Sequence, residues 1–229
     1  MSSVDGRLLD NRWTQPFGET DKTELLKVYA AIGRELNTDA WMFGKNTVCA
    51  VFPEKSNKGN TPFSRTASVF MGERHSERMF IVSDPDGDIL FTSSTTLRGD
   101  NILVVLGRNV TEEYLAFLRG MRISYAVVED ATDLHAGLEA ANREFGIRSV
   151  SVQGGGILNG ALLKEGVIDE LSLVVYPGID GLAGIPSVFE YIGSKTDCPA
   201  KGQNLQLLSV EQREYGVVWL RYKFHFNNK

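Results

Sequence analysis

Three consecutive glycines, Gly154, Gly155 and Gly156, stand between a short apolar segment and an amphipathic one. Glycines at a strand-to-helix turn permit positive φ and let a ligand approach the main chain. The start of the following helix offers unpaired N–H groups and the positive end of its dipole to an anion. The run therefore predicts a site for an anionic ligand such as a dinucleotide. The alternative is a purely structural turn beneath a crowded helix crossing.

The residues around the glycines separate this loop from two familiar phosphate-binding motifs. A Rossmann fingerprint would place its third glycine where Asn159 stands, and an acidic residue about 20 positions further on. Asp169 and Glu170 come too soon for that role. A Walker A loop is excluded because no Gly-Lys-Ser/Thr sequence follows.

Composition restricts the classes of function. A chain of 229 residues that is 42% hydrophobic and 23% charged is typical of one compact domain, expected here over residues 1–229. A net charge of −5 and the lack of a long apolar run predict neither a nucleic-acid partner nor a membrane association. Two distant cysteines and three scattered histidines show no metal-ligand spacing and no disulfide framework, so we expect a cytoplasmic protein without a metal.

Helical and extended patterns alternate along the chain, which predicts an α/β protein. Apolar runs bounded by polar residues predict strands covered on both faces. Strands are expected at 40–43, 79–82, 102–106, 125–128, 149–152 and 170–176. Helices are expected after Asp21 in a capping box with Glu24, after Thr111, from about Thr132 to Gly146, and from the glycine run to Gly166.

The remaining segments have loop or hairpin composition. A polar stretch at 53–65 predicts a long loop, and residues 181–202 are rich in Gly and Pro. Strand-like segments at 205–210 and 217–226 are expected to pair as a C-terminal antiparallel hairpin through the Glu214-Tyr215-Gly216 turn.

Segments 3–7, 39–47 and 154–171 resemble, in the right order, the reductase domain of bacterial riboflavin-biosynthesis enzymes, the RibD C-terminal domain family. The resemblance spans nearly the whole chain. It implies a dihydrofolate-reductase-like fold, in which helices flank a mixed, mainly parallel central sheet. It also implies NADPH bound across strand ends, a small pyrimidine- or pterin-like substrate opposite the nicotinamide, and a homodimer formed through the C-terminal region.

The resemblance assigns cofactor contacts to three segments. Gly44, Lys45 and Thr47 resemble a segment that touches the cofactor phosphates, with Lys45 supplying charge and Thr47 a hydroxyl. As an alternative, this segment is a surface turn with a helix cap. Val82 and Ser83 match the end of a strand that approaches the adenosine 2′-phosphate. The third segment is the glycine loop, with Gly154, Gly155, Gly156, Ile157, Leu158 and Asn159.

Two neighbouring charges affect the expected phosphate contacts. Asp84 beside Ser83 would repel a phosphate unless its carboxylate points away. Arg108, just beyond another strand, can provide a further cation or lie in solvent.

On the substrate side, the resemblance assigns roles to Asp5, Arg7 and Gln153. A carboxylate at Asp5 can orient the substrate or relay a proton, and Arg7 can hold a ring carbonyl. In isolation, Asp5-Gly6 is also a good turn dipeptide. Gln153 stands where riboflavin reductases carry Glu, and residues 48–62 lack the Asp-Asn-Pro and Arg of those enzymes.

Three readings follow from these residues. The first is an NADPH-dependent reductase of a pyrimidine- or pterin-like small molecule, such as 5-amino-6-(5-phosphoribosylamino)uracil in riboflavin biosynthesis. The sequence lacks the deaminase zinc motif, so this reductase would stand alone. The second is a nucleotide-binding or sensing module without turnover, motivated by Gln153. The third is an interaction protein in which the glycines are structural.

Overall fold

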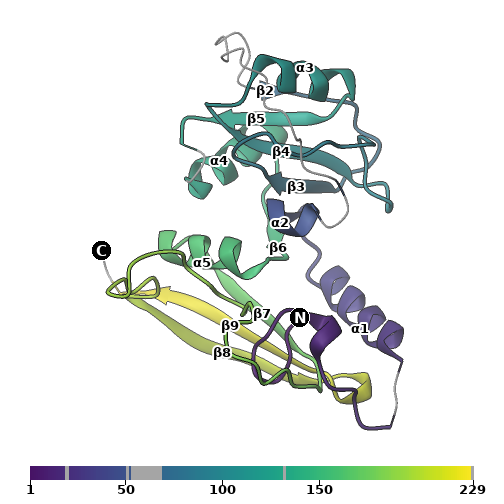
Figure 1. The fold of residues 1–229 in the computed structure, drawn as a ribbon, viewed down its shortest axis with the longest axis vertical. Helices are drawn as coiled ribbons and strands as arrows, with labels where there is room; N and C mark the ends of the chain where they lie inside the picture. Colours follow the sequence, from purple (N-terminus) through teal and green to yellow (C-terminus); the bar gives the residue numbers. More distant parts are fainter. Residues whose placement is uncertain (19–20, 50–51, 53–68, 131–132, 228–229) are drawn as a thin grey trace. The chain divides into compact units, whose positions relative to one another are not determined.

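The computed structural model describes residues 1–18, 21–49, 52, 69–130 and 133–227. It divides into two compact units, coloured by sequence in Figure 1. Residues 38–154 form one, called here the parallel-sheet unit, and residues 1–37 with 155–229 form the other, the antiparallel-sheet unit. The loop predicted at 53–65 lies outside the described residues. A single domain over the whole chain stays a prediction.

The parallel-sheet unit is built on a six-stranded sheet in the order β2-β5-β4-β3-β1-β6. β5, β4, β3, β1 and β6 pair in parallel, and the short β2 joins β5 antiparallel at the edge. All residues of β4 are buried, as the continuous apolar run predicts. The strand bounds are β1 Ala40–Gly44, β2 Val69–Phe70, β3 Met79–Ser83, β4 Asn101–Gly107, β5 Ser124–Val128 and β6 Val150–Val152.

Helices cover both faces of this sheet. On one face, Leu115 of α3 (Glu112–Gly120) belongs to the same apolar cluster as Val104 of β4. The next residue, Val105, points to the opposite face, where it contacts α4 (Leu134–Phe145). A Cβ on Gly137 of α4 would lie 2.9 Å from Cγ1 of Val105. A short α2 (Lys45–Val48) follows β1 directly. The predicted helix-flanked, mainly parallel sheet is confirmed.

Helix boundaries follow the predicted local signals. The Thr111 hydroxyl accepts from the Tyr114 N–H at the start of α3, and Gly146 ends α4 with φ 70°. At the start of α1 (Lys22–Glu35), Asp21 accepts from the Thr23 N–H. Glu24 pairs with Lys27. These contacts give a side-chain cap at Asp21, and the reciprocal half of the predicted capping box is replaced by an i,i+3 ion pair.

The antiparallel-sheet unit contains a three-stranded sheet in the order β7-β9-β8. β8 and β9 form the predicted hairpin, with the turn at Glu214–Gly216. β7 pairs with β9 in this sheet and so extends the hairpin. The elements of this unit are η1 Asp10–Arg12, α1, α5 Gly156–Glu165, β7 Glu170–Val175, β8 Gln203–Gln212, η2 Glu214–Gly216 and β9 Val218–Phe226.

Apolar contacts attach α1 to this sheet. Leu25 and Ile32 of α1 share a buried cluster with Val174 of β7 and Trp219 of β9. The N-terminal residues add to the edge of β7, because the Ser2 N–H donates to the Val174 carbonyl over 2.9 Å. The segment at 3–7 therefore begins beside the end of β7.

Candidate functional site

The carboxyl ends of β1, β3 and β6 meet at one edge of the parallel sheet. Gly44 is the register partner of Ser83, and the Gly44 N–H donates to the Gly154 carbonyl over 3.1 Å. The chain runs from β1 outward through β3, β4 and β5, and then returns to β6 on the other side of β1. Such a reversal of strand order is where open parallel sheets bind ligands, beyond the carboxyl ends of the strands. The three predicted segments thus converge at a topological switch point.

Lys45 follows this switch point at the start of α2. Its ammonium Nζ lies 2.5 Å from Oδ2 of Asp88, in a half-buried ion pair. Asp88 itself is buried. The positive charge that the resemblance assigns to the cofactor phosphates is therefore present at the strand edge and is matched by a carboxylate.

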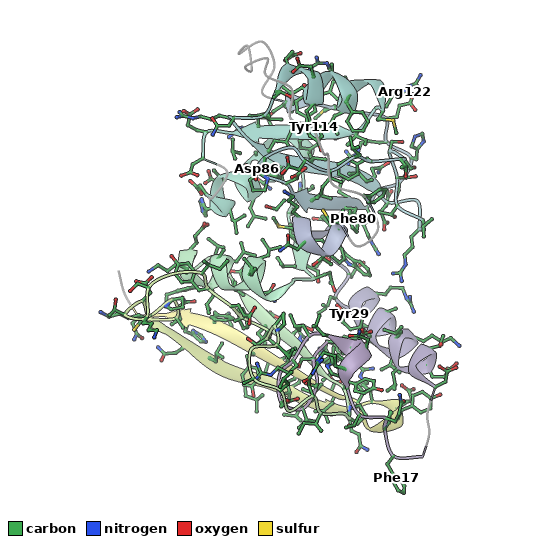
Figure 2. The ribbon with its side chains drawn as sticks, in the orientation of Figure 1. Phe17, Tyr29, Phe80, Asp86, Tyr114 and Arg122 are labelled. Carbon is green, nitrogen blue, oxygen red and sulfur yellow. The ribbon has the colours of Figure 1, made fainter. Side chains whose placement is uncertain are left out.

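Asp84 holds the turn that carries Asp88. Its Oδ2 accepts from the Asp88 N–H over 2.9 Å and from the Ile89 N–H over 3.0 Å. The hydroxyl of Tyr114, a residue labelled in Figure 2, lies 3.2 Å from the same oxygen. Burial raises the pKa of the Asp84 carboxyl. This carboxylate points into the interior of the unit, which is the condition under which it would not repel a phosphate beside Ser83.

Other residues assigned to the cofactor in this unit differ in accessibility. Thr47 is exposed, whereas Ser83 is buried. The Val82 side chain is fully buried in the apolar cluster under α3, so it supports the strand and cannot touch a ligand. Arg108 is exposed and forms an ion pair with Glu129.

Gln153 continues the pairing of β6 with β1. Its N–H donates to the Met42 carbonyl over 2.8 Å, and its side-chain Nε2 donates to Ser151 Oγ over 2.7 Å. The residue therefore places a neutral amide at the carboxyl end of β6, just before the glycine run.

The three glycines differ in backbone conformation and in the space around them. Gly154 has φ 91°, a backbone conformation that favours glycine. Gly156 begins α5, and a Cβ there would lie 2.2 Å from the Ser187 carbonyl oxygen. Gly155 is the N-cap of α5, with φ −74° and ψ −165°, an extended conformation open to any residue. The structural reading thus accounts for Gly154 and Gly156, while the backbone conformation of Gly155 does not require glycine.

The first turn of α5 packs against residues 187–191 within the antiparallel-sheet unit. The Asn159 Nδ2 donates to the Val188 carbonyl over 2.7 Å, and the Glu190 N–H donates to the Gly156 carbonyl over 2.9 Å. Leu158 is buried and Ile157 is exposed. This partner segment was not among the predicted site residues, because it lies in a Gly- and Pro-rich stretch with no periodic pattern.

Asp5 lies in a tight turn in which Gly6 adopts φ 77°. Its carboxylate accepts from Ser3 Oγ over 2.6 Å and from the N–H groups of Asp180 and Gly181 over 3.1 and 2.8 Å. The Ser3 hydroxyl and these N–H groups lower the pKa of Asp5 to about 2. The carboxylate is therefore ionised at neutral pH and is a weaker base than an ordinary aspartate, which suits it to orienting a substrate.

Arg7 is fixed at the end of the same turn. Its Nη1 donates to the Ile185 carbonyl over 2.9 Å, and its Nε lies 4.0 Å from Asp5 Oδ2. Nearby, the guanidinium of Arg12 contacts both carboxylate oxygens of Asp180. The segment at 3–7 and the loop at 180–185 are thus joined by charge-assisted hydrogen bonds.

We expect the stability of Asp5→Asn to fall less steeply in acid than the stability of the parent protein. A carboxyl whose pKa is depressed on folding contributes stability above its unfolded value, and this contribution is lost as pH falls from about 4 toward about 2. Urea unfolding midpoints between pH 2.5 and 7 measure the effect. The exposed Asp169→Asn, in the same unit, is the control. An Asp5→Asn protein that loses stability in acid as steeply as the parent would contradict the expectation.

Among the residues that the structure describes, no three or more His, Cys, Asp and Glu side chains are grouped in a way that could hold a metal ion. In that same part of the chain, none of the helices is both long and apolar enough to span a membrane.

Comparison with known proteins decides the family. The model of the RibD C-terminal domain matches residues 1–219. The chain belongs to this family. Membership points to a reductase-type enzyme that binds a nucleotide cofactor.

Solved structures of the same kind agree on the fold. Acinetobacter baumannii RibD matches 98% of this chain with a TM-score of 0.61 and 19% identity, and the chain spans 56% of that protein's length. A pyrimidine reductase-like protein from Corynebacterium diphtheriae matches 98% of this chain and 89% of its own, with a TM-score of 0.59 and 17% identity. At these identities the likeness shows the fold alone, and the dihydrofolate-reductase-like architecture is confirmed.

Proposed function

We propose that this protein is an NADPH-dependent reductase of a small pyrimidine- or pterin-like molecule. The observation that carries the proposal is the convergence of Gly44, Ser83 and Gly154 at the switch point of the parallel sheet. The dinucleotide when bound supplies the hydride, and the protein's part is to bind, orient and exclude water.

The chemical groups of the candidate residues suit different parts of the cofactor and the substrate. Lys45 and the exposed hydroxyl of Thr47 suit phosphate oxygens, and the extended main chain at Gly155 suits close approach of a pyrophosphate. Asp5, held as an ionised carboxylate, orients the substrate, and Arg7 binds a ring carbonyl.

The specific substrate we propose is 5-amino-6-(5-phosphoribosylamino)uracil. The names of the similar structures, RibD and a pyrimidine reductase-like protein, support this class of substrate. Gln153 is neutral where riboflavin reductases carry Glu. Other heterocycles with a similar ring should therefore be tested as substrates beside this uracil. A cytoplasmic location is part of the proposal, supported by the sequence, whose two distant cysteines form no disulfide framework.

Titration with the two dinucleotides tests the proposal. We expect NADPH to quench tryptophan fluorescence at lower concentration than NADH, and the purified protein to oxidise NADPH in the presence of the uracil substrate. Absence of NADPH binding would refute the proposal. Binding without turnover across the heterocycle screen would favour the second candidate, a nucleotide-sensing module, for which the neutral Gln153 amide is the specific argument.

We also propose that the protein forms a homodimer through the hairpin. β8 is the edge strand of its sheet. A bulge between Leu207 and Ser209 interrupts the alternation of side chains between the two faces of β8. Val210 therefore lies on the same face as Leu205 and Leu207. These three side chains are 50–58% exposed. An edge strand with an apolar face is a ready surface for pairing with a second copy.

We expect Val210→Lys to weaken this dimer. A lysine would bring a charge into an apolar interface, and losing the burial of one such side chain corresponds to roughly a tenfold higher dissociation constant. Gln206→Lys adds the same charge on the opposite face of β8 and is the control. Analytical ultracentrifugation over a concentration series measures both. Equal dissociation constants for the two variants would place the interface elsewhere.

A further inference from the structure

We propose that Asp88 is an internal competitor for the phosphate of the ligand: it holds the Lys45 ammonium in the free protein and must release it when phosphate binds. The inference rests on the proposed function, since it assigns Lys45 to a phosphate. It adds a residue that sets the strength of that contact, and so makes Asp88 a positioning residue with an effect on affinity.

The ion pair is placed where it is strong. The Lys45 and Asp88 side chains are 22% and 10% exposed, and their charged atoms lie 2.5 Å apart. Partial burial strengthens such a pair relative to one in solvent, and it also raises the cost of leaving either charge without its partner. A phosphate that takes Lys45 would therefore leave a buried carboxylate at Asp88, and this cost would be subtracted from the affinity for the ligand.

Asp88 cannot easily turn away to make room. The N–H groups of Asp88 and Ile89 both donate to the buried Asp84 carboxylate. The Tyr114 hydroxyl lies within hydrogen-bond distance of the same carboxylate and donates to the Ile89 carbonyl over 2.8 Å. Gly87 adopts φ 67°, and a Cβ on it would lie 2.7 Å from the Tyr114 ring. The turn is thus braced on three sides.

Lys45 is the partner that moves. Its flexible four-carbon stem can redirect the ammonium, whereas the Asp88 carboxylate sits on a short stem in a fixed turn. The exchange is then a transfer of one ammonium between two anions, the Asp88 carboxylate and the ligand phosphate. Removing the Asp88 charge should strengthen the binding of any ligand whose phosphate uses Lys45.

The same turn offers a matched control. Asp86 is exposed, lies two positions before Asp88 and is labelled in Figure 2. Asp86→Asn changes the net charge by the same amount as Asp88→Asn, so long-range electrostatics affect both variants alike. A difference between the two reports the contact with Lys45.

Calorimetric titrations with NADPH test the inference. We expect Asp88→Asn to bind about tenfold more tightly than the parent, a change of about 1.4 kcal/mol, and Asp86→Asn to stay within about twofold. The gain should vanish in a Lys45→Met background, because the two residues act on one contact. Asp88→Asn binding no tighter than Asp86→Asn, or a gain that persists without Lys45, would overturn the inference.

Ligand fragments and a second readout separate this inference from the proposed function. If Asp88→Asn binds only 2′-phospho-ADP-ribose more tightly than the parent does, Lys45 meets the 2′-phosphate. If it binds both this fragment and ADP-ribose more tightly, Lys45 meets the pyrophosphate. Either result supports the inference. If the parent protein does not bind NADPH, the proposed function fails. The ¹⁵Nζ resonance of Lys45 then decides the inference. It should shift in Asp88→Asn, and in this variant it should respond to inorganic pyrophosphate at a lower concentration than in the parent protein. An unchanged resonance would refute the competition.

Discussion

Replacing Gly160 with alanine is expected to destabilise the antiparallel-sheet unit by about 3 kcal/mol, the upper range for overpacking a core. A Cβ at this position would lie 2.3 Å from the carbonyl carbon and oxygen of Glu190 and 2.6 Å from the Tyr191 nitrogen. These are main-chain atoms, which cannot move aside as the tip of a flexible side chain can. Urea unfolding followed by tryptophan fluorescence measures the loss, since Trp13 and Trp219 lie in this unit.

Gly120→Ala is the matched control for this prediction. Gly120 also lies in an α-helix, but a Cβ there would meet nothing within 4 Å. Alanine should then stabilise the protein by up to about 1 kcal/mol through helix propensity. A Gly160→Ala protein as stable as the parent would show that α5 and residues 187–191 do not approach each other this closely in solution.

Replacing Gly155 with valine is expected to weaken NADPH binding by at least roughly tenfold, because the side chain would hold the pyrophosphate away from the main chain. The backbone of Gly155 is extended and admits any residue, so the loss should come without an equal loss of stability. Titration with NADPH and urea unfolding of the same preparations measure the two effects.

A graded pair sharpens this test. Gly155→Ala should weaken binding less than Gly155→Val, because the methyl group intrudes less on the ligand. An unchanged NADPH affinity in both variants, with the fold intact, would favour the structural reading of the whole glycine run.

Elements were predictable where their cause is local. The strand at β4 follows from an apolar run long enough to be buried on both faces. Thr111 and Gly146 mark helix ends because a hydroxyl cap and a left-handed glycine act within one turn of the chain. The hairpin turn at Glu214–Gly216 has the same local origin.

The candidate site was predictable in part. The segments ending at Gly44, Ser83 and Gly154 could be assigned to strand ends and to a nucleotide from the glycine run and the family resemblance. Parallel strands bring such ends to one edge of the sheet. The convergence required only that the three strands be neighbours, which the register confirms.

The charge balance of the site was decided by the tertiary structure alone. Lys45 and Asp88 are 43 positions apart, and Asp5 receives hydrogen bonds from residues 175 and 176 positions further on. No local pattern signals such partners, because they depend on which turns the folded sheets bring together. The sequence by itself determined the strands, the helix ends and the glycine run. Only the tertiary structure decided that Lys45 faces a carboxylate and that hydrogen bonds lower the pKa of Asp5. It also decided that Gly154 is required by its positive φ and Gly156 by the nearby Ser187 carbonyl, whereas the backbone conformation of Gly155 does not require glycine.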